Sequence, residues 1–340
     1  MVRFGIAGFG LHAVKRLMPG FTGAERCAVT ALARRDPVKA RASAAEFDIP
    51  EYYTTTEELC RSPQVDAVLV TSPDALHLPD VLTAVEQGRP VLCEKPLAMN
   101  ADEARRMVAA ARGAGVLFGV AQVFRFEDST RWFRERIAAG AIGRPLTARA
   151  EFFYPARESP RRWIADPELA CGGPIADVGV HCIDALRFIL DDEVERVGTR
   201  AVADEDSGSF EATAVLSLDF IAGTLAAVAV STRASYRTFL EVVGDEGSIV
   251  ALDALNVERP ITIERRVPAG GEVVERVEMD NTDAYARQVD AFALAMEEDV
   301  PFPVPGQEGL RNQLILEAAF RSRHSGRVEE VKNRQVEQVV

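Results

Sequence analysis

The sequence has few histidines and cysteines, and it has no long apolar run. Its five cysteines are scattered without a C-x-x-C pair, so neither a zinc ribbon nor a disulfide framework is expected, and the thiols are expected to be reduced. No stretch approaches the ~20 consecutive apolar residues of a membrane helix, and the apolar start at residues 1–8 is too short for a signal peptide. These absences predict a cytoplasmic protein with no membrane partner.

Positive charge is also scarce. The chain has 39 lysines and arginines against 52 aspartates and glutamates, which gives a net charge of −13 at pH 7. An acidic chain without a local basic cluster disfavours nucleic acid and anionic membranes as partners. The 340 residues, 47% of them hydrophobic and 27% charged, are typical of a globular protein with about two domains.

The first motif is a glycine-rich turn that follows a short apolar strand at residues 3–8. Residues 8–13 read Gly-Phe-Gly-Leu-His-Ala, and a helical pattern continues to about Met18. This G-x-G-x-x-A spacing between a strand and a helix is typical of dinucleotide-binding sites, because Gly8 permits the tight turn and Gly10 lets the backbone approach a pyrophosphate. An ordinary tight turn is the alternative. The expected cofactor contacts are Gly8, Phe9, Gly10, Leu11, His12 and Ala13.

The end of the second strand, residues 28–33, carries a signal for cofactor choice. The strand runs into Arg34 and Arg35, with Lys39 about one turn later. A site for NAD favours an acid at this point for the ribose 2′-hydroxyl, whereas arginine suits the 2′-phosphate of NADP. Asp36 is expected instead to cap the next helix. The sequence therefore favours NADP over NAD, and the alternative is a pair of solvated surface arginines.

Strands and helices continue to alternate up to residue 120. Such alternation predicts a doubly wound parallel sheet with right-handed crossovers, in which the carboxyl ends of the strands meet in one crevice. Gly8, Arg34, Thr71 and Glu94 mark four of these ends. The expected elements are strands at 66–71, 91–95 and 116–120, a helix at 75–87, and a helix that Asn100 and Glu103 cap and that runs to about Arg112.

Lys95 ends the apolar run that begins at Val91, and Pro96 follows it. A desolvated lysine at the carboxyl end of a buried strand can give a proton to a ligand or take one from it. Lys95 is therefore a candidate catalytic residue. The alternative is an ion pair between Lys95 and Glu94 at the rim of the sheet.

After residue 122 the pattern changes to consecutive strands. About seven strand-like stretches between 193 and 278 are separated by Gly or Asp turns, which predicts a mainly antiparallel sheet in an α+β half. The other expected elements are a helix at 129–139, a strand at 145–154, a polar loop at 155–162, closing helices at 283–298 and 307–323, and a tail from Val328 that is partly ordered at best.

A second polar motif lies in this half. Residues 172–184 read Gly-Gly-Pro-Ile-Ala-Asp-Val-Gly-Val-His-Cys-Ile-Asp, and a helix is expected to begin near Pro174. Spacings of four and three place Asp177, His181 and Asp184 on one helix face. A carboxylate one turn before a histidine can fix its tautomer and stabilise its charged form, and a purely structural Asp–His hydrogen bond is the alternative. No metal site is expected, because the other three histidines are remote in sequence.

Together these motifs resemble the Gfo/Idh/MocA family, named for glucose–fructose oxidoreductase and inositol dehydrogenase. The resemblance covers nearly the whole chain and implies a Rossmann domain at residues 1–121 and a substrate-binding α+β domain at 122–340, with helices at 283–323 packing back. It also implies homodimers or homotetramers formed through the large sheet. The residues that carry it are the fingerprint, Thr71-Ser72-Pro73 with His77, Glu94-Lys95-Pro96, Asp177 and His181, and the closing set of Tyr285, Gln288, Phe292, Glu317, Ala318 and Ser322.

The resemblance also implies roles for individual residues. Lys95 would contact the reacting hydroxyl or carbonyl group and the nicotinamide ribose. His181 would be the acid and base, alone or with Lys95, and Asp177 would orient the substrate or His181. The resemblance further implies that the cofactor meets Arg34, Arg35, Lys39, Thr71, Ser72, Pro73, His77, Glu94, Gln122 and Trp163, and that the substrate also meets Arg125 and Tyr285.

The sequence therefore predicts an NADP-dependent oxidoreductase that acts on a secondary alcohol or carbonyl group of a sugar, a polyol or a cyclic diol. Within the family, the chain is similar to dimeric dihydrodiol dehydrogenases and NADP-dependent xylose dehydrogenases, which share the pattern of Ala33, Arg35 and Asp36. One alternative is a non-catalytic dinucleotide-sensing regulator on the same fold, although such a protein can dispense with Lys95 and His181. The other alternative is an NAD-linked enzyme.

Overall fold

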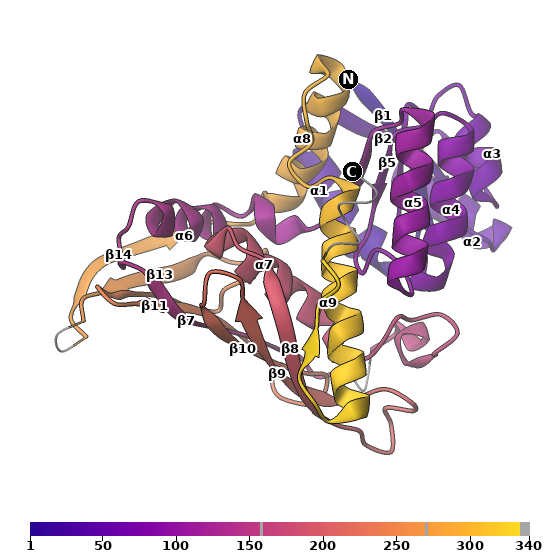
Figure 1. Ribbon diagram of the computed structural model, residues 1–340. Helices are drawn as coiled ribbons and strands as arrows, with labels where there is room; N and C mark the ends of the chain where they lie inside the picture. Colours follow the sequence, from indigo (N-terminus) through magenta and orange to yellow (C-terminus); the bar gives the residue numbers. More distant parts are fainter. Residues whose placement is uncertain (157–158, 269–270, 334–340) are drawn as a thin grey trace.

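The computed structural model describes residues 1–156, 159–268 and 271–333, which form two sheets with helices packed on them (Figure 1). The first sheet lies in the N-terminal half and is parallel, and the second is larger and mainly antiparallel. The predicted fold class, an α/β Rossmann half followed by an α+β half, is confirmed.

The first sheet has six strands in the described part of the chain. They are β1 (Val2–Ala7), β2 (Cys27–Ala33), β3 (Glu51–Tyr53), β4 (Ala67–Val70), β5 (Val91–Cys93) and β6 (Phe118–Val120). Their order is β3-β2-β1-β4-β5-β6. The order reverses beside β1, and sheets of this kind bind ligands at the carboxyl ends of the strands around such a point.

Helices cover both sides of this sheet. They are α1 (Met18–Gly23), α2 (Pro37–Glu46), α3 (Thr56–Arg61), α4 (Asp74–Glu86) and α5 (Ala101–Ala114), joined by α8 (Ala284–Glu298) from the end of the chain. Helices α3, α4 and α5 lie on one side, and α1 packs against α8 on the other (Figure 1). The strands between them are therefore buried on both faces, which explains their continuous apolar runs.

The second sheet has nine strands among the described residues. They are β7 (Pro145–Phe153), β8 (Val194–Val202), β9 (Thr213–Phe220), β10 (Leu225–Ser231), β11 (Arg237–Gly244), β12 (Ser248–Leu252), β13 (Ile261–Arg266), β14 (Val273–Met279) and β15 (Glu329–Glu330). Their order is β14-β13-β12-β11-β7-β10-β9-β8-β15, and only the β7–β10 pair is parallel. The seven strands predicted between residues 193 and 278 correspond to β8 through β14.

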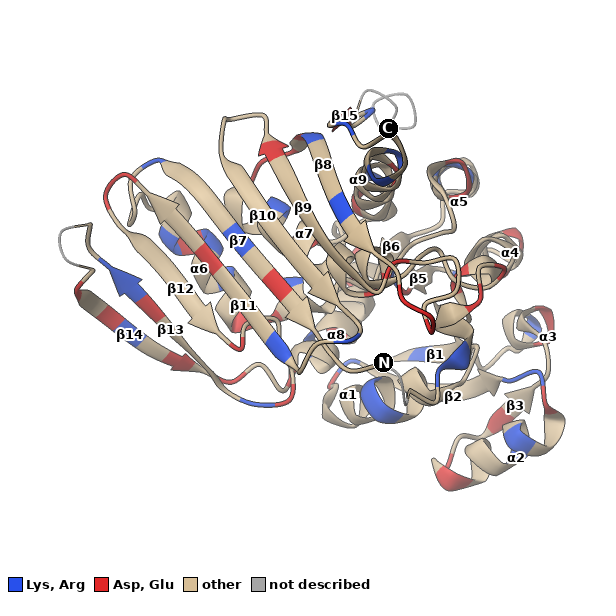
Figure 2. Cartoon of the chain, turned by 90° about the horizontal axis from the view of Figure 1, so that it is seen from below, with Lys and Arg blue, Asp and Glu red and all other residues tan. Residues whose placement is uncertain are grey.

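One face of the second sheet packs on helices, and the other is open in the single chain (Figure 2). The covering helices are α6 (Asp128–Ala138), α7 (Val180–Leu190) and α9 (Gly306–Ser325). Buried and exposed side chains therefore alternate along strands such as β9. In β9, Leu216 and Leu218 are fully buried, whereas Val215, which precedes Leu216, is 51% exposed. This period of two is the expected result of a sheet with one covered face.

The closing helices α8 and α9 connect the two halves. Helix α9 runs along β8 and also contacts α5 and β6. The approach is close because α9 begins with small residues: a Cβ at Gly309 would lie 2.7 Å from the Leu97 side chain. The carboxylate of Glu317 also accepts the Ala101 N–H at the start of α5, at 2.7 Å. The first sheet and the second are therefore held together by packing around α9.

Several predictions about single elements are confirmed, although some elements end at other residues than predicted. Asp36 caps α2 as predicted, accepting the N–H groups of Val38 and Lys39. Strand β5 ends at Cys93, so Lys95 lies two residues beyond it. Of the tail predicted from residue 328, the described part forms β15, and residues 334–340 lie outside the described residues.

Two helices begin differently from the prediction. The helix after the fingerprint contains a π-helical segment, η1 (Ala13–Leu17), and the helix after Pro174 begins with another, η4 (Ile175–Gly179), before α7. Two short 3₁₀ turns, η2 (Val123–Phe126) and η3 (Arg162–Ala165), complete the elements. Single π-turns within α-helices are often found at functional sites.

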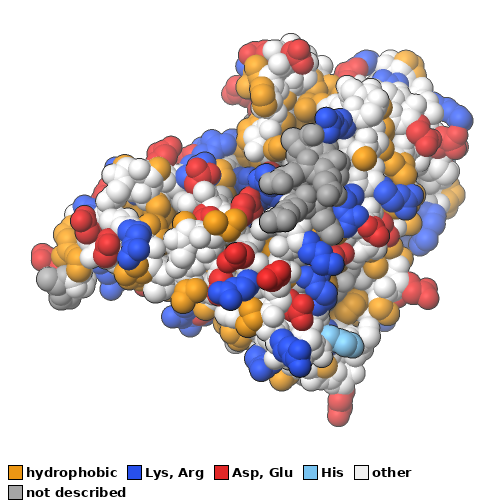
Figure 3. Space-filling view, in the orientation of Figure 1, with side chains coloured by type: hydrophobic (Ala, Val, Ile, Leu, Met, Phe, Trp, Pro, Cys, Tyr) orange, Lys and Arg blue, Asp and Glu red, His pale blue; other side chains and the backbone are white. Residues whose placement is uncertain are grey.

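The described surface mixes charges of both signs. Acidic and basic side chains are interspersed over the face seen in Figure 3, and no large area of its described residues carries one sign. None of the described helices combines the length and the apolar character needed to cross a bilayer.

Candidate active site

Two adjoining cavities lie at the carboxyl ends of the first sheet's strands, and residues from both halves line them. We call the one beside the glycine-rich turn the fingerprint groove, with a volume of about 500 Å³, and the other the central chamber, with about 460 Å³. Both cavities are lined by the same bridging set: Leu11, His12, Glu94, Lys95, Pro160, Arg161 and Asp177.

The glycine-rich turn shapes one wall of the fingerprint groove. Gly8 has φ +83°, and a Cβ there would lie 2.5 Å from the Ser72 amide nitrogen, so only glycine fits. A Cβ at Gly10 would lie 3.6 Å from the Gly8 carbonyl oxygen, an ordinary contact. Packing within the chain thus requires Gly8 but not Gly10. The absence of a side chain at Gly10, with Ala13 buried behind it, fits a backbone surface that a pyrophosphate approaches at a helix start.

The arginines after β2 lie at the far end of the groove. Arg34 and Arg35 both line it, and Arg34 donates to the Ser43 hydroxyl at 2.8 Å. Arg35 is exposed and forms no ion pair with any described residue. Lys39 does not line the groove: its ammonium group lies 3.7 Å from the Asp36 carboxylate on the surface of α2. At this end the groove therefore offers the guanidinium groups of Arg34 and Arg35, and Lys39 does not add a third cation there.

The ends of β4 and β5 form the opposite wall. Thr71 donates to the Gly8 carbonyl at 2.9 Å, which holds the two loops together. The His77 ring lies between Pro96 O, 3.1 Å from Nδ1, and Ser72 O, 2.9 Å from Nε2, so it ties one strand end to the other. Gln122 does not line either cavity: it is buried, and its Nε2 has no partner among the described residues. Phe9, Pro73 and Trp163 complete the predicted contacts that line the groove.

Lys95 lies where the groove meets the chamber. Its ammonium group donates to the Asp177 carbonyl oxygen at 2.8 Å and lies 3.8 Å from the Asp177 carboxylate. The alternative of a rim ion pair with Glu94 is wrong, because Glu94 binds His12 instead, with Nε2 and Oε1 2.9 Å apart. Lys95 thus joins the end of β5 to the start of the helix that carries Asp177 and His181.

The Asp177 carboxylate is held by groups that were not predicted. The Tyr154 hydroxyl donates to it, and the guanidinium group of Arg161 lies 3.6 Å away. Burial alone would raise the pKa of Asp177, but Arg161 and Lys95 outweigh burial, and the pKa is lowered. Asp177 therefore stays ionised. The expectation that it hydrogen-bonds His181 is wrong, because Tyr154 takes the place of the imidazole.

His181 lies on α7 with its ring in the chamber wall. Phe124 packs edge-on against it at 4.6 Å between ring centroids, and Phe152 stacks at 6.2 Å. Burial, with the positive charge of Lys95, holds the pKa of His181 well below its usual value, so the ring is neutral. Its Nδ1 is buried without a partner in the described part of the chain. A neutral imidazole in this position can accept a proton.

Tyr285 closes the chamber beside the fingerprint. Its ring meets the His12 ring edge-on at 6.0 Å between centroids, and both residues line the chamber. Burial raises the pKa of the Tyr285 phenol, and the Glu94 carboxylate raises it further. Tyr285 is therefore a neutral hydroxyl that can donate a hydrogen bond to a ligand.

Arg125 corrects another expectation, because it does not line the chamber or the groove. Its guanidinium group forms a two-pronged pair with Asp184, at 2.8 and 2.7 Å, and a second contact of 2.7 Å with Glu308. The group is 8% exposed. Asp184 thus faces Arg125 and not the cavity that Asp177 lines, and Arg125 is placed to stabilise the fold, not to bind substrate.

The chamber residues that were not predicted include the two that hold the Asp177 carboxylate, Tyr154 and Arg161. Tyr154 follows β7, and Arg161 lies in the polar loop beyond it. The only signal in the sequence was an aromatic residue at a strand end followed by a basic loop, a pattern too common to assign. Only the fold shows that this loop crosses the mouth of the first sheet.

The sequence matches two family models. Residues 2–122 match a model described as "Oxidoreductase family, NAD-binding Rossmann fold", and residues 130–250 match the "GFO/IDH/MocA C-terminal domain". Together the two models cover most of the chain, including the fingerprint, Lys95, Asp177 and His181.

Known proteins match over nearly the whole chain. A 1,5-anhydro-D-fructose reductase from Ensifer adhaerens is 33% identical over 296 residues, which cover 86% of this chain and 87% of that protein. A D-xylose 1-dehydrogenase (NADP(+)) 2 from Haloferax volcanii is 31% identical, covering 95% of this chain and 98% of that protein. The solved structure of a levoglucosan dehydrogenase with NADH and levoglucosan shares the fold, with a TM-score of 0.87 at 20% identity over 97% of this chain and 99% of that chain. The chain belongs to the Gfo/Idh/MocA family of NAD(P)-dependent oxidoreductases.

Proposed function

We propose that this protein is an NADP-dependent oxidoreductase that interconverts a CH–OH group and a carbonyl group on a sugar, a polyol or a cyclic diol. The observation that carries the proposal is the meeting of Lys95, Asp177 and His181 in one chamber that opens at Lys95 onto the fingerprint groove. The names of the two curated relatives, a reductase of an anhydrosugar and a dehydrogenase of xylose, support the substrate class.

The proposed roles follow from charge and contact. NADP, when bound, supplies the hydride acceptor. His181 is neutral and lines the chamber, so it takes the proton as the hydroxyl oxygen becomes a carbonyl oxygen and the carbon gives up its hydride. Lys95 donates a hydrogen bond to the same oxygen. Asp177 stays ionised, fixes the Lys95 ammonium group and accepts a hydrogen bond from the substrate.

The cofactor preference rests on the arginines after β2. Arg34 and Arg35 line the groove, and the one nearby acid, Asp36, is engaged as the cap of α2. A guanidinium group binds a 2′-phosphate well, whereas a 2′-hydroxyl calls for an acid that is free to accept. The relatives differ in the cofactor that their names give: the xylose enzyme is named for NADP, and the levoglucosan enzyme was solved with NADH.

The open face of the second sheet supports a homo-oligomer. Along β10 the outward residues are small, Ala227 and Ala229, and the exposed Leu225 and Val215 extend the apolar area. A band of charge crosses it where Glu151 pairs with the outward arginines Arg149 and Arg237 (Figure 2). A flat face of small and apolar residues with paired charges suits a second copy of the same sheet.

A substrate panel tests the proposed function. Aldoses, inositols, sugar acids and dihydrodiols are incubated with NADP⁺ and NAD⁺, and reduction of the cofactor is followed by absorbance. We expect turnover of at least one sugar, polyol or diol, with NADP⁺ favoured by about tenfold or more. Tight binding of NADPH with no turnover of any compound would instead support the dinucleotide-sensing regulator. Equal use of the two cofactors would refute the role given to the arginines.

A further inference from the structure

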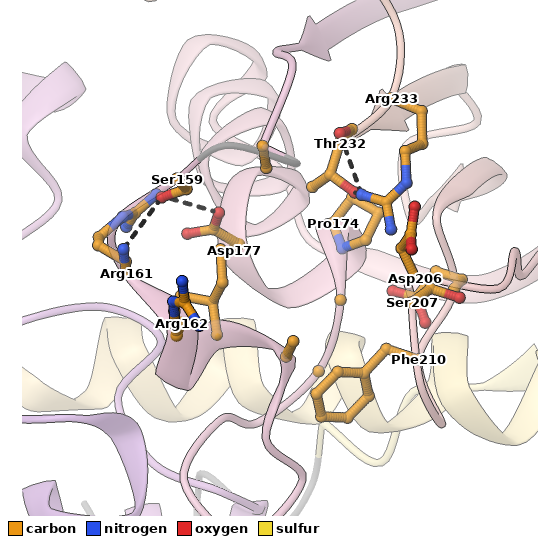
Figure 4. Close-up of a pocket in the computed structure, with 16 residues that line it drawn as sticks. Ser159, Arg161, Arg162, Pro174, Asp177, Asp206, Ser207, Phe210, Thr232 and Arg233 are labelled. Carbon is orange, nitrogen blue, oxygen red and sulfur yellow. Dashed lines mark hydrogen bonds and ion pairs between the residues drawn. The ribbon is translucent and has the colours of Figure 1, made fainter.

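A third cavity opens beside the central chamber, between the loop after β7 and the loop that joins β8 to β9. We call it the side pocket. Its volume is about 380 Å³, within the range of small-molecule sites. In Figure 4, Ser159, Arg161 and Asp177 lie on one side of it and Asp206 and Phe210 on the other.

The side pocket adjoins the chamber. Ser159, Arg161 and Asp177 line both cavities and therefore lie at the boundary between the two. Lys95 and His181 line the chamber but not the side pocket. A ligand that crosses this boundary would place one end against the proposed acid and base and the other end in the pocket.

The residues that line the side pocket indicate which chemical groups of a ligand could bind there. Its wall combines an aromatic ring, Phe210, and small apolar side chains with groups that donate and accept hydrogen bonds. Among the described residues that line the pocket, three guanidinium groups balance three carboxylates. The guanidinium groups belong to Arg161, Arg162 and Arg233, and the carboxylates belong to Asp177, Asp206 and Glu211.

This balance argues against an anionic ligand. Arg233 is paired with Asp204, with Nη2 and Oδ1 2.9 Å apart, and Glu211 is paired with Arg323 at 2.8 Å. Arg162 alone among these arginines has no partner among the described residues, and it is exposed. One solvated cation in an acidic protein is a weak anion site. A neutral ring with several hydroxyl groups matches the lining better, since it can both donate and accept.

We infer that the side pocket is a second carbohydrate subsite and that the preferred substrate is a neutral two-ring saccharide. The inference rests on the proposed function, because the first ring must react at Lys95 and His181. The second ring would then pass Arg161 and Asp177 and lie against Phe210.

Paired substrates test the inference. With NADP⁺, kcat/KM is measured for D-xylose against xylobiose and for D-glucose against cellobiose and lactose. We expect at least one disaccharide to exceed its monosaccharide by about tenfold, equivalent to about 1.4 kcal/mol. Phe210→Ala and, independently, Ala165→Trp at an exposed lining position should remove this gain, whereas Phe210→Tyr should keep it. Thermal unfolding of each variant checks that it is folded.

Several results would overturn the inference. They are a ratio near one for every pair, a ratio that neither variant changes, or a larger gain for glucuronate and gluconate than for any disaccharide. If no sugar is turned over, the proposed function fails, and saturation-transfer NMR with the three disaccharides still decides the subsite. The subsite is supported if both rings of a disaccharide give signals with the wild type and only one ring does with Phe210→Ala. It is refuted if neither ring gives a signal.

Discussion

Arg35 is the residue that we propose to recognise the 2′-phosphate of the cofactor. It lines the fingerprint groove, it is exposed, and no described residue neutralises it. Arg35→Ala should raise the KM for NADP⁺ by about tenfold or more, because a charge-assisted hydrogen bond to a phosphate contributes about 1.5–3 kcal/mol. The KM for NAD⁺ should change less than about twofold. Arg41→Ala, on the exposed side of α2, is the matched control, and parallel shifts for both cofactors would argue against the assignment.

Glu127 is a buried carboxyl group that carries a pH dependence. Ser129 and Thr130 donate to one of its oxygens, and the other has no partner among the described residues. Burial raises its pKa from 4.5 to about 8, so the folded state binds a proton that the unfolded state has released at intermediate pH. Stability from this group is complete below about pH 4.5 and is lost as the pH rises towards 8.

Replacement of Glu127 by glutamine should remove this loss. Glu127→Gln should leave the free energy of unfolding nearly unchanged at pH 5 and increase it relative to the wild type at pH 8, by roughly 2–4 kcal/mol. Urea unfolding at the two pH values measures the difference. A stability difference that does not depend on pH would show that the carboxyl group is ionised in the folded protein.

For individual residues, the sequence was sufficient to predict a position where that position follows from a strand end or a helix face. Lys95 lies at the mouth of the sheet because parallel strands end together there, and Gly8 is required by its backbone angle. Arg125 was predicted to meet the substrate but lies outside both cavities, because a short turn does not reveal which way its side chain points. Tyr154 was missed because its partner, Asp177, is 23 residues away along the chain.

Three elements, η2, α7 and α9, meet at a buried cluster of charged side chains around Arg125. This guanidinium group on η2 joins Asp184 of α7 to Glu308 of α9, so one side chain connects three elements. Arg125→Met should lower the free energy of unfolding by about 3–5 kcal/mol, because it removes the two-pronged partner of the buried Asp184 carboxylate and one of the partners of Glu308. The folded fraction should keep the wild-type KM for substrate.

The control for Arg125 lies nearby on α6. Arg134 pairs with Asp191 at the surface and contacts the same Phe188 ring, and Arg134→Met should cost less than about 1 kcal/mol. Chemical denaturation and steady-state kinetics on the same preparations separate the two effects. A large rise in KM for Arg125→Met with unchanged stability would restore the original expectation that Arg125 binds substrate.

The helix that carries Asp177 and His181 shows what the helical period cannot predict. Asp177 lies in the π-helical segment η4, whereas His181 and Asp184 lie in α7. Asp177 and His181 line the same chamber although the π-turn lies between them, whereas Asp184, in the regular helix with His181, faces Arg125. The spacing of four and three therefore did not keep all three side chains in one cavity. The alternation of strands and helices in the first half was predictable, although its first helix also contains a π-helical segment, η1.

The whole molecule exposes one flat face, on the second sheet. If this face joins two copies, a charge in its centre should separate them. Ala229→Lys, beside the Glu151 position of β7, should convert a dimer or tetramer into smaller species in sedimentation velocity. Ala222→Lys, in the exposed turn before β10, should leave the assembly intact. A wild-type protein that is monomeric at high concentration would contradict the proposed interface.

The central claim is that Lys95 from the first half and His181 from the second act on one substrate. The most direct measurement compares Lys95→Met with the exposed control Lys332→Met for NADPH affinity and for turnover. The account predicts that Lys95→Met keeps NADPH affinity within about threefold and loses about 10²–10⁴-fold in kcat, while Lys332→Met matches the wild type. Turnover by Lys95→Met at the wild-type rate would contradict it.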